Sequence, residues 1–211
     1  MQPGAWFILN ATAGGQVLVK VGISLVSAAN AKSNLQADQP GWDFNSIKNK
    51  AAVQCNKELS KIKVEGGSDN DKKIFYTGIY HILQHPNIIC DINGEYPAMG
   101  CHRTMQSKRA HYTIFSLWDT YRNVHPFLTL AYPERQSDMV ACIIDVYKEN
   151  GWLPKWELAA TETKVMVGDP ALIVVADTYL RASAILVWPL RTTQCCTTRV
   201  CIKMRTPFGR R

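Results

Sequence analysis

The spacing of apolar residues is the feature that most constrains the fold of this chain. Over residues 44–62 they recur every three or four positions, which places one apolar face on a helix of about five turns. Asp43 is suited to cap the N-terminus of this helix, and Gly66 and Gly67 are suited to stop the segment. The predicted face comprises Phe44, Ile47, Ala51, Cys55, Leu59 and Ile62.

The same spacing predicts further helices along the chain. Residues 74–83 form one of them, which Pro86 ends. Residues 118–132 form another, which Pro126 is expected to kink. A mainly α fold follows from this pattern.

Capping signals accompany the last two predicted helices. Pro133 suits the first turn of one helix, and Gly151 suits its C-terminal cap. Asp169 and Pro170 start the other helix. The predicted buried stripes are Met139, Ile143, Val146 and Tyr147 in the first, and Leu172, Val175, Ala176 and Tyr179 in the second.

Residues 16–26 show a different pattern. They are rich in β-branched side chains and partly alternate between apolar and polar, which predicts a strand. Residues 87–111 are punctuated by Gly94, Pro97 and Gly100 and are predicted to be irregular. The predicted chain is thus a short β segment followed by antiparallel helices that long loops connect.

The net charge of +7 comes from one end of the chain. Residues 181–211 hold seven Arg and Lys and no Asp or Glu, which leaves 17 basic and 17 acidic residues in residues 1–180. A nucleic-acid-binding protein carries its basic charge on the surface of a folded domain. The distribution therefore disfavours nucleic acid as a partner.

Several other classes are disfavoured by the absence of their signals. No apolar run approaches the ~18–20 residues of a membrane span. The first residues lack the basic head and apolar core of a secretory signal. The seven cysteines include no CxxC pair, which disfavours zinc. The DxNG string that starts at Asp91 matches part of a calcium loop, but the remaining ligand positions fail, so a turn is predicted.

Three loop-rich segments combine aromatic rings with carboxylates: residues 91–100, 112–126 and 151–163. Flat rings pack on the apolar faces of sugars, and carboxylates accept hydrogen bonds from pairs of sugar hydroxyls. The composition of these segments favours carbohydrate chemistry.

Purely structural roles are open for the same side chains. Trp118 suits a core position, and Asp119 suits a helix cap or a partner of the helix dipole. His125 suits a buried core histidine, and Glu157 and Glu162 suit exposed charges on a helix.

The chain resembles glycoside hydrolase family 92, a family of calcium-dependent, exo-acting α-mannosidases found mainly in glycan-degrading bacteria. The resemblance runs in order from about residue 15 to residue 181. Its blocks are VLVKVGISLVSAANAKSNLQADQPGWDF, FYTGIYHILQHPNIICDINGEYPAMG, HYTIFSLWDTYRNVHPFLTLAYPERQSDM and ENGWLPKWELAATETKVMVGDPALIVVADTYL. The sequence departs from the family pattern at Cys55, Ala160 and Val165.

This resemblance implies a division of the chain. The family combines an N-terminal β-sandwich with an (α/α)6 toroid, and its active site lies between them. Residues 1–40 would be the end of the sandwich and a linker, and residues 41–181 a part of the toroidal catalytic domain. Residues 182–211 would be an aberrant basic tail.

The resemblance also implies roles for five residues. Trp118 and Asp119 match the family's WD pair, which lines the subsite for the terminal mannose, with Asp119 accepting hydrogen bonds from ring hydroxyls. Trp156, Glu157 and Glu162 match the WEL…ET block and are pocket-lining candidates. Calcium is expected for the complete enzyme, but its ligands are not identifiable in this sequence.

The catalytic carboxylates expected from the family do not occur in these residues. Inversion needs an acid and a base about 6.5–9.5 Å apart. The family carries them in TEGN-like and NDDxGQ-like segments, and neither string is present. The chain is therefore expected to be an internal fragment that is inactive alone.

The last residues suggest why the resemblance stops. After Leu180 the family continues with a KGIRDF-like string, whereas this chain reads RASAIL. A shift of one base permits KGIRDFGV, so a frameshift is the preferred interpretation of residues 182–211. A genuine divergent tail is the alternative.

The resemblance therefore implies part of a glycosidase that releases terminal mannose from α-mannosides during N-glycan degradation, with inversion and with calcium. The expected partners are α-mannoside glycans, and the expected location is periplasmic or secreted. The alternative is a non-catalytic carbohydrate-binding or structural helical module.

Overall fold

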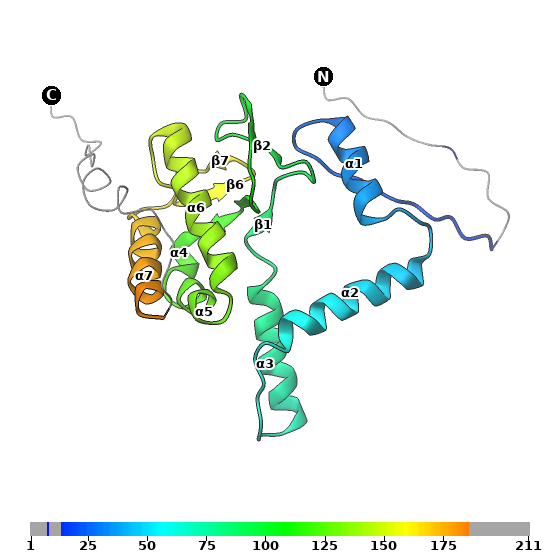
Figure 1. Ribbon diagram of the computed structural model, residues 1–211, viewed down its shortest axis with the longest axis horizontal. Coiled ribbons are helices and arrows are strands. Elements are labelled where there is room, and N and C mark those ends of the chain that lie inside the picture. Colours follow the sequence, from blue (N-terminus) through cyan, green and yellow to red (C-terminus); the bar gives the residue numbers. More distant parts are fainter. Residues whose placement is uncertain (1–7, 9–13, 186–211) are drawn as a thin grey trace.

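The computed structural model describes Ile8 and residues 14–185. The part of the predicted tail beyond residue 185 lies outside the described residues. Helices dominate, as predicted, and small antiparallel sheets lie between them (Figure 1). The helices are α1 (Ala28–Asp38), α2 (Phe44–Leu59), α3 (Asp69–Ile82), α4 (Leu117–Thr120), α5 (Val124–Ala131), α6 (Pro133–Asn150) and α7 (Pro170–Ile185).

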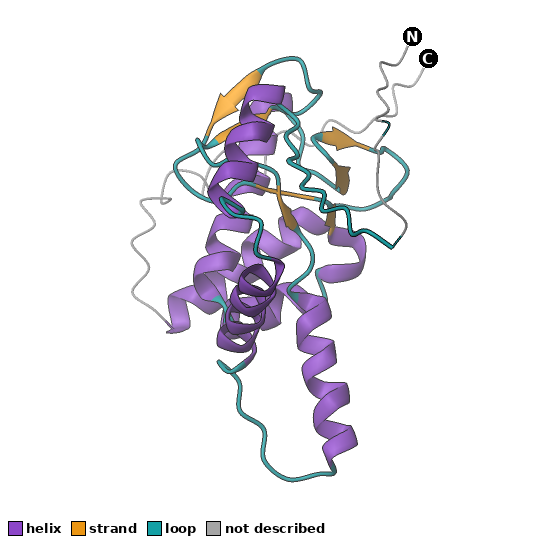
Figure 2. Cartoon of the chain, turned by 90° about the vertical axis from the view of Figure 1, so that its right-hand side faces the viewer, coloured by secondary structure: helices purple, strands orange, loops and turns teal. Residues whose placement is uncertain are grey.

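The strands are short, and all of their pairings are antiparallel. They form the antiparallel pairs β1–β4 and β2–β3 and the three-stranded sheet β5–β6–β7. In Figure 2 the strands gather toward one end of the helices. Their bounds are β1 (Asn87–Ile88), β2 (Glu95–Pro97), β3 (Thr104–Gln106), β4 (Tyr112–Thr113), β5 (Phe115–Ser116), β6 (Trp156–Leu158) and β7 (Thr161–Glu162).

The predicted strand over residues 16–26 is wrong. No described residue pairs with this segment, and its apolar side chains are exposed, with Val19 at 73% and Ile23 at 74%. A β-strand is stable only when a neighbouring strand satisfies its backbone hydrogen bonds. The sequence pattern therefore indicated a β propensity, but the described residues include no strand that pairs with this segment.

Helix α1, which was not predicted, follows this segment. Ser27 caps it, because its side chain accepts a hydrogen bond from the Asn30 backbone N–H at 3.1 Å. The Asn30 amide donates to Asp91 and to Glu95 at 2.7 Å each, and the Asn34 amide donates to Asp91 at 2.7 Å. Polar contacts, rather than an apolar face, thus attach α1 to the body.

Helix α2 has the predicted start and the predicted periodicity, but its apolar face is not buried. Asp43 is the N-cap and accepts from the Ser46 backbone N–H at 3.1 Å. None of the residues of α2, all of them described, is buried, and Phe44 is 67% exposed. The helix ends at Leu59, before the predicted glycine stop.

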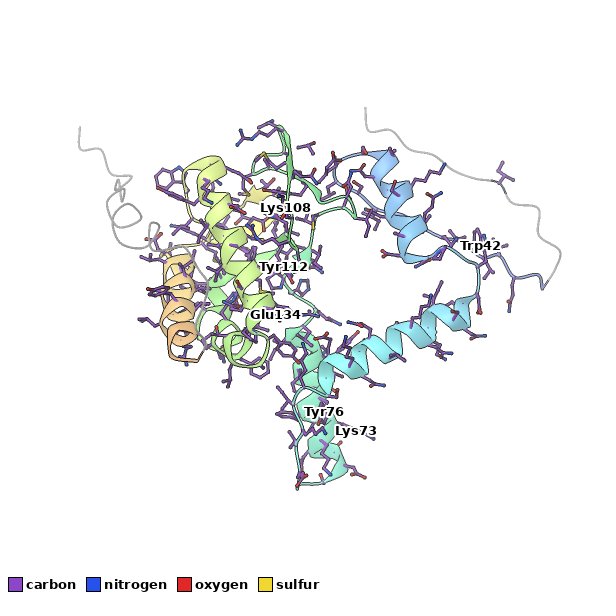
Figure 3. All side chains as sticks on the ribbon, in the orientation of Figure 1. Trp42, Lys73, Tyr76, Lys108, Tyr112 and Glu134 are labelled. Atoms are coloured by element: carbon purple, nitrogen blue, oxygen red, sulfur yellow. The ribbon has the colours of Figure 1, made fainter. Side chains whose placement is uncertain are left out.

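The C-terminal end of α2 is held against the body by polar contacts. The Tyr132 hydroxyl donates to the backbone carbonyl of Glu58 at 3.0 Å, and the Glu58 carboxylate lies 3.0 Å from Lys61 and 3.4 Å from Arg135. Figure 1 shows α2 running from this junction toward α1, away from the other helices. Figure 3 shows Trp42 at the far end of this span and Tyr76 farther down α3, close to Lys73.

Helix α3 agrees with its prediction in type and in end point. Ser68 forms a capping box with Asp71: each side chain bonds the other residue's backbone N–H. The helix therefore starts earlier than its apolar periodicity indicated, because a capping signal needs no apolar side chain. Leu83 caps the C-terminus, shortly before Pro86.

The predicted helix over residues 118–132 is wrong, because two helices occupy this stretch. Helix α4 is a single turn, and α5 begins at Val124 after a break. Pro126 lies in the first turn of α5, where backbone N–H groups make no intrahelical hydrogen bonds. Its lack of an N–H therefore costs no hydrogen bond, and it does not kink a longer helix.

Helix α6 has the predicted caps. Pro133 is its first residue, and Gly151 follows its last turn with φ +82° and donates its N–H to the Tyr147 carbonyl at 2.7 Å. A left-handed φ at this position favours glycine. Of the predicted stripe, Met139, Ile143 and Val146 are buried, whereas Tyr147 is half-buried.

Helix α7 begins at Pro170 as predicted, but it turns a different face inward. Its buried side chains are Ala171, Val174 and Thr178, whereas Tyr179 is 44% exposed. The helix is apolar on most of its circumference, so periodicity alone does not define its rotation. The contacts with α5 and α6 define it instead.

The core lies among α4–α7 and the strands that precede α4. Burial of these apolar side chains is the main favourable contribution to folding. Its buried members are Tyr112, Phe115, Leu117, Leu128, Tyr132, Met139, Val140, Cys142, Ile143, Ala171 and Val174. Tyr112, which Figure 3 labels, lies on β4, and β4 contacts α6.

A polar network crosses the same core. The Nδ1 atom of His125 lies 3.0 Å from Oε1 of Gln136, and the Gln136 amide donates to the Thr178 hydroxyl at 2.8 Å. The three residues are 0–3% exposed. The network links α5, α6 and α7 through directional contacts.

Within residues 14–185, no helix is long and apolar enough to cross a bilayer.

Candidate functional site

The sheet β5–β6–β7 brings two of the predicted segments together. Phe115 pairs with Glu157 and Ser116 pairs with Trp156 across β5 and β6. Glu157 also pairs with Glu162 across β6 and β7. Trp118 and Asp119 follow β5 directly, so the five site residues predicted from the sequence lie on or beside one small sheet.

Trp118 and Asp119 lie at the surface in the first turn of α4. Trp118 is 41% exposed, so the alternative of a core tryptophan is wrong. Asp119 is exposed and accepts a hydrogen bond from the Ser116 hydroxyl at 2.6 Å. Ser116 is the N-cap of α4, so Asp119 is not the cap, although its charge lies in the first turn.

Two buried neighbours fix this exposed pair. The side chains of Phe115 and Leu117 are 0% exposed and belong to the core. They flank Ser116, the last residue of β5, and Leu117 directly precedes Trp118 in the first turn of α4. The backbone that carries the exposed pair is therefore anchored from below.

Glu162 organises the strand pair β6–β7. Its carboxylate accepts hydrogen bonds from the backbone N–H groups of Lys155 at 2.8 Å, Trp156 at 3.3 Å and Lys164 at 3.2 Å. The residue is half-buried on β7, so the alternative of an exposed helix charge is wrong. Trp156 is half-buried on β6.

Glu157 lies beneath the surface. It is 2% exposed, on β6, so the helix-charge alternative is wrong for it as well. Its carboxylate accepts from the Thr113 hydroxyl at 2.7 Å, the Ile114 N–H at 2.9 Å and the Ala160 N–H at 2.5 Å. Burial raises the pKa of Glu157, although these hydrogen bonds act in the opposite direction.

Left-handed backbone surrounds this carboxylate. Ile114 has φ +63°, Ala159 +47° and Ala160 +62°. A β-branched residue such as isoleucine rarely adopts a positive φ. Strain of this kind persists only where surrounding contacts hold it, and it gathers at functional sites.

Sequence reasoning missed a second buried polar group nearby. The His111 ring stacks on Tyr96 with centroids 3.6 Å apart, and the Tyr96 hydroxyl donates to Glu149 at 2.8 Å. Burial lowers the pKa of His111 to about 4. Neither residue shows a periodic signal, because strand pairing and the turns between the strands determine their contact.

His125 is buried at 1% exposure, as its structural alternative predicted. Only its Nδ1 atom has a described partner, and Nε2 is buried without one among the described residues. Burial lowers the pKa of His125. A neutral ring within the α5–α6–α7 network follows from these contacts.

A hollow of about 720 Å³ lies elsewhere in the described residues. It is lined by α1, by the segment before α1 and by the loops around β1 and β2. Its polar lining includes Asn34, Asp91, Lys108 and Arg109. Figure 3 shows Lys108 on the body above Tyr112. The hollow shares no residue with the Trp118–Asp119 surface.

The described part of the chain does not identify ligands for the expected calcium. It contains no group of three or more His, Cys, Asp or Glu side chains that could hold a metal. The Asp91 carboxylate faces Asn30, Asn34 and Ser24, each of which donates a hydrogen bond to it at 2.7 Å. The Gly94 N–H donates to the Asp91 carbonyl at 2.8 Å, which confirms the predicted turn.

An exposed tryptophan beside a carboxylate, carried by a rigid core, is typical of a carbohydrate-binding surface. Comparisons with known proteins identify the family of the chain. Residues 30–193 match the model of the glycosyl hydrolase family 92 catalytic domain. The chain belongs to glycosyl hydrolase family 92.

Solved structures of family members have the same fold. A family 92 α-mannosidase from Bacteroides thetaiotaomicron, in complex with mannoimidazole, superposes with a TM-score of 0.70 at 32% identity, over 75% of this chain and 21% of that one. A family 92 inverting mannosidase from the same organism superposes with a TM-score of 0.70 at 28% identity, over 74% and 21% of the two chains.

A curated relative comes from the fungus Arthroderma benhamiae. This uncharacterized secreted glycosidase is 24% identical over 188 residues, which is 86% of this chain and 20% of the relative. The chain thus spans about a fifth of the length of the proteins it matches.

Proposed function

We propose that this chain carries the part of an α-mannosidase catalytic domain that contacts the terminal mannose of α-mannoside glycans. Trp118 and Asp119 are the contact residues in this proposal. One observation carries it: within a family of glycoside hydrolases, the exposed Trp118–Asp119 pair lies beside the WEL…ET segment on one sheet. The mannosidases among the solved relatives supply the substrate class.

Each contact residue has a defined chemical task. The 41%-exposed ring of Trp118 offers an apolar face on which the C–H face of a pyranose can pack. The Asp119 carboxylate can accept two hydroxyl hydrogen bonds, and charge-assisted bonds of this kind are the stronger ones. The Ser116 hydroxyl donates to the same carboxylate and holds its rotamer.

We assign no residue of this chain to cleavage of the glycosidic bond. The acid and the base of an inverting mannosidase would come from TEGN-like and NDDxGQ-like segments, which the sequence lacks. We therefore propose that the 211-residue chain binds mannosides without hydrolysing them. Bound calcium would supply electrostatic stabilisation to the complete enzyme.

The surrounding architecture is part of the same proposal. Residues 41–181 would contribute to an (α/α)6 toroid, and residues 1–40 to the end of a β-sandwich and its linker. The apolar side chains exposed before α1 support an additional packing partner for that segment. The secreted relative supports a secreted or periplasmic location.

Affinity and turnover of the purified chain test the proposal together. Methyl α-mannoside should bind more tightly than its C2 epimer, methyl α-glucoside, and Trp118→Ala should abolish the difference. An aryl α-mannoside should remain intact with calcium and with a chelator. Equal affinity for both epimers would contradict the mannose site, and calcium-dependent hydrolysis would contradict the inactive chain.

A non-catalytic carbohydrate-binding module is the second candidate. The missing catalytic segments favour it for the chain in isolation. A longer polypeptide that includes sequence downstream of residue 181 in the family reading frame distinguishes the two candidates. It should hydrolyse the aryl mannoside if the chain belongs to an enzyme, and only bind it if the chain is a module.

A further inference from the structure

The buried carboxylate of Glu157 lies at the point where the chain turns toward the proposed mannose site. It accepts hydrogen bonds from Thr113 and Ile114, the two residues directly before β5. It also accepts the Ala160 N–H from the turn between β6 and β7. One side chain thus joins Thr113 and Ile114, which lie 44 and 43 residues before it in the sequence, to Ala160, which lies three residues after it.

Two of its three donors belong to residues with left-handed backbone. Ile114 has φ +63° and Ala160 has φ +62°. For a non-glycine residue this conformation is sparsely populated, and for a β-branched one it is a genuine outlier. A hydrogen bond from the strained residue's own N–H to a fixed acceptor favours the strained conformation over its relaxed alternatives.

The path from Ile114 to the site is short. Phe115 and Leu117 insert fully into the core, and the Ser116 hydroxyl donates to Asp119 at 2.6 Å. Ile114 directly precedes β5, and α4 with the exposed pair directly follows β5, so a change of φ at Ile114 alters the direction of the backbone that leads to the pair. It would rotate β5 relative to β4 and move the exposed pair.

We propose that Glu157 is a positioning residue that orients Trp118 and Asp119 by holding the left-handed backbone at Ile114. The inference rests on the proposed function, because it assigns a role in the same site. It replaces the pocket-lining role that resemblance implied for Glu157 by an action through the backbone.

Glu149 provides a matched control. Its carboxylate is half-buried and accepts one hydroxyl bond, from Tyr96 at 2.8 Å, and one backbone N–H bond, from Met99 at 2.9 Å. Glu149 thus accepts one hydroxyl and one backbone N–H, as Glu157 does from Thr113 and Ile114. The residues that donate to Glu149 lie outside the segment from Ile114 to Asp119. Replacement of Glu149 therefore perturbs stability without moving that path.

The experiment follows the indole N–H signal of Trp118 by NMR in the 211-residue chain, with Trp118→Phe to assign it. Glu157→Gln should shift this signal and lower the affinity for methyl α-mannoside at least ~10-fold, since hydrogen bonds to charged groups are involved. Thr113→Val, which removes one donor, should shift it less and in the same direction. Glu149→Gln should lower the melting temperature and leave the Trp118 signal in place.

If Glu157→Gln does not fold, the Trp118 signal of Thr113→Val tests the positioning role of Glu157. An unmoved Trp118 signal in every folded variant, with affinity equal to that of the wild type, overturns the positioning role. A wild-type chain without affinity for methyl α-mannoside overturns the proposed function instead. In that case the Trp118 signal alone still tests whether Glu157 orients the exposed pair.

Discussion

Asp119 carries the sharpest expectation for a single side chain. Asp119→Asn keeps the shape but removes the charge, so the affinity for methyl α-mannoside should fall by about 10- to 100-fold, which corresponds to 1.5–3 kcal/mol. The melting temperature should change little, because the residue is exposed. Titration calorimetry and a thermal melt measure both quantities.

The control for this variant is Asp177→Asn. Asp177 pairs with Arg181 at 2.7 Å on α7 and has no contact with the sheet of the site in the described structure. Its replacement should leave mannoside affinity unchanged. Wild-type affinity in a folded Asp119→Asn chain would mean that Asp119 serves only the first turn of α4.

His111 gives the chain a pH dependence with a defined sign. Its pKa is about 4 in the folded protein against 6.5 ordinarily, so the unfolded chain binds the proton more readily between these values. Stability should therefore be retained above pH 6.5 and fall by up to about 3 kcal/mol as the pH drops toward 4.

Denaturant unfolding of His111→Phe checks this expectation. Phenylalanine keeps the stack on Tyr96 but cannot take up a proton. The variant should lose less stability than the wild type between neutral pH and about pH 4. Identical losses in the two proteins would exclude His111 as the source.

Single residues were predictable where the signal was local. Asp43 and Gly151 were identified as caps because capping chemistry depends on a few neighbouring residues. Glu157 was not identified as buried, because its environment forms only when β5 and β6 pair. The exposed Trp118 was named through family resemblance, since composition alone favoured a core position.

At the level of elements, the network across α5, α6 and α7 has a measurable cost of removal. Gln136→Leu leaves the His125 ring and the Thr178 hydroxyl without their mutual partner. Each buried group left unpaired costs about 1–3 kcal/mol, so unfolding free energy should fall by about 2–5 kcal/mol. Urea denaturation measures it.

Gln54→Leu on α2 is the matched control for that variant. Gln54 is exposed, and its only described partner is Glu58 at 3.5 Å. The change in unfolding free energy should be within about 0.5 kcal/mol. An equally small effect of Gln136→Leu would show that the network contributes no net stability.

Periodicity predicted element type better than element packing. It located α2, α3, α6 and α7. It also predicted a buried face on α2 that the described residues do not cover, and it predicted the wrong buried face for α7. It also predicted α4 and α5 as one helix, because the break between Thr120 and Val124 does not interrupt the spacing of apolar residues. Burial depends on neighbours distant in sequence, which a local pattern does not contain.

At the level of the whole molecule, exposed apolar surface should govern the behaviour of the chain. Apolar side chains before α1 reach 73% exposure at Val19 and 74% at Ile23, and Phe44 on α2 is 67% exposed. Patches of more than a few hundred Å² favour association. The purified chain should therefore self-associate and bind hydrophobic dyes.

Light scattering after size-exclusion chromatography checks this expectation. Replacement of Val19 and Ile23 by Lys should reduce both the associated fraction and the dye fluorescence. A monodisperse wild-type monomer with a sharp cooperative melt would contradict it and would indicate that the chain covers this surface itself.

The central claim is that Trp118 and Asp119 form a mannose-contacting surface, and an NMR titration with methyl α-mannoside tests it most directly. The six tryptophans give separate indole signals that can be assigned by substitution. The claim predicts a saturable shift of the Trp118 signal and nuclear Overhauser contacts between its ring and the sugar C–H face, with saturation at a higher sugar concentration for Asp119→Asn or for methyl α-glucoside. An unmoved Trp118 signal at saturating mannoside, or the same response to the glucoside, would contradict it.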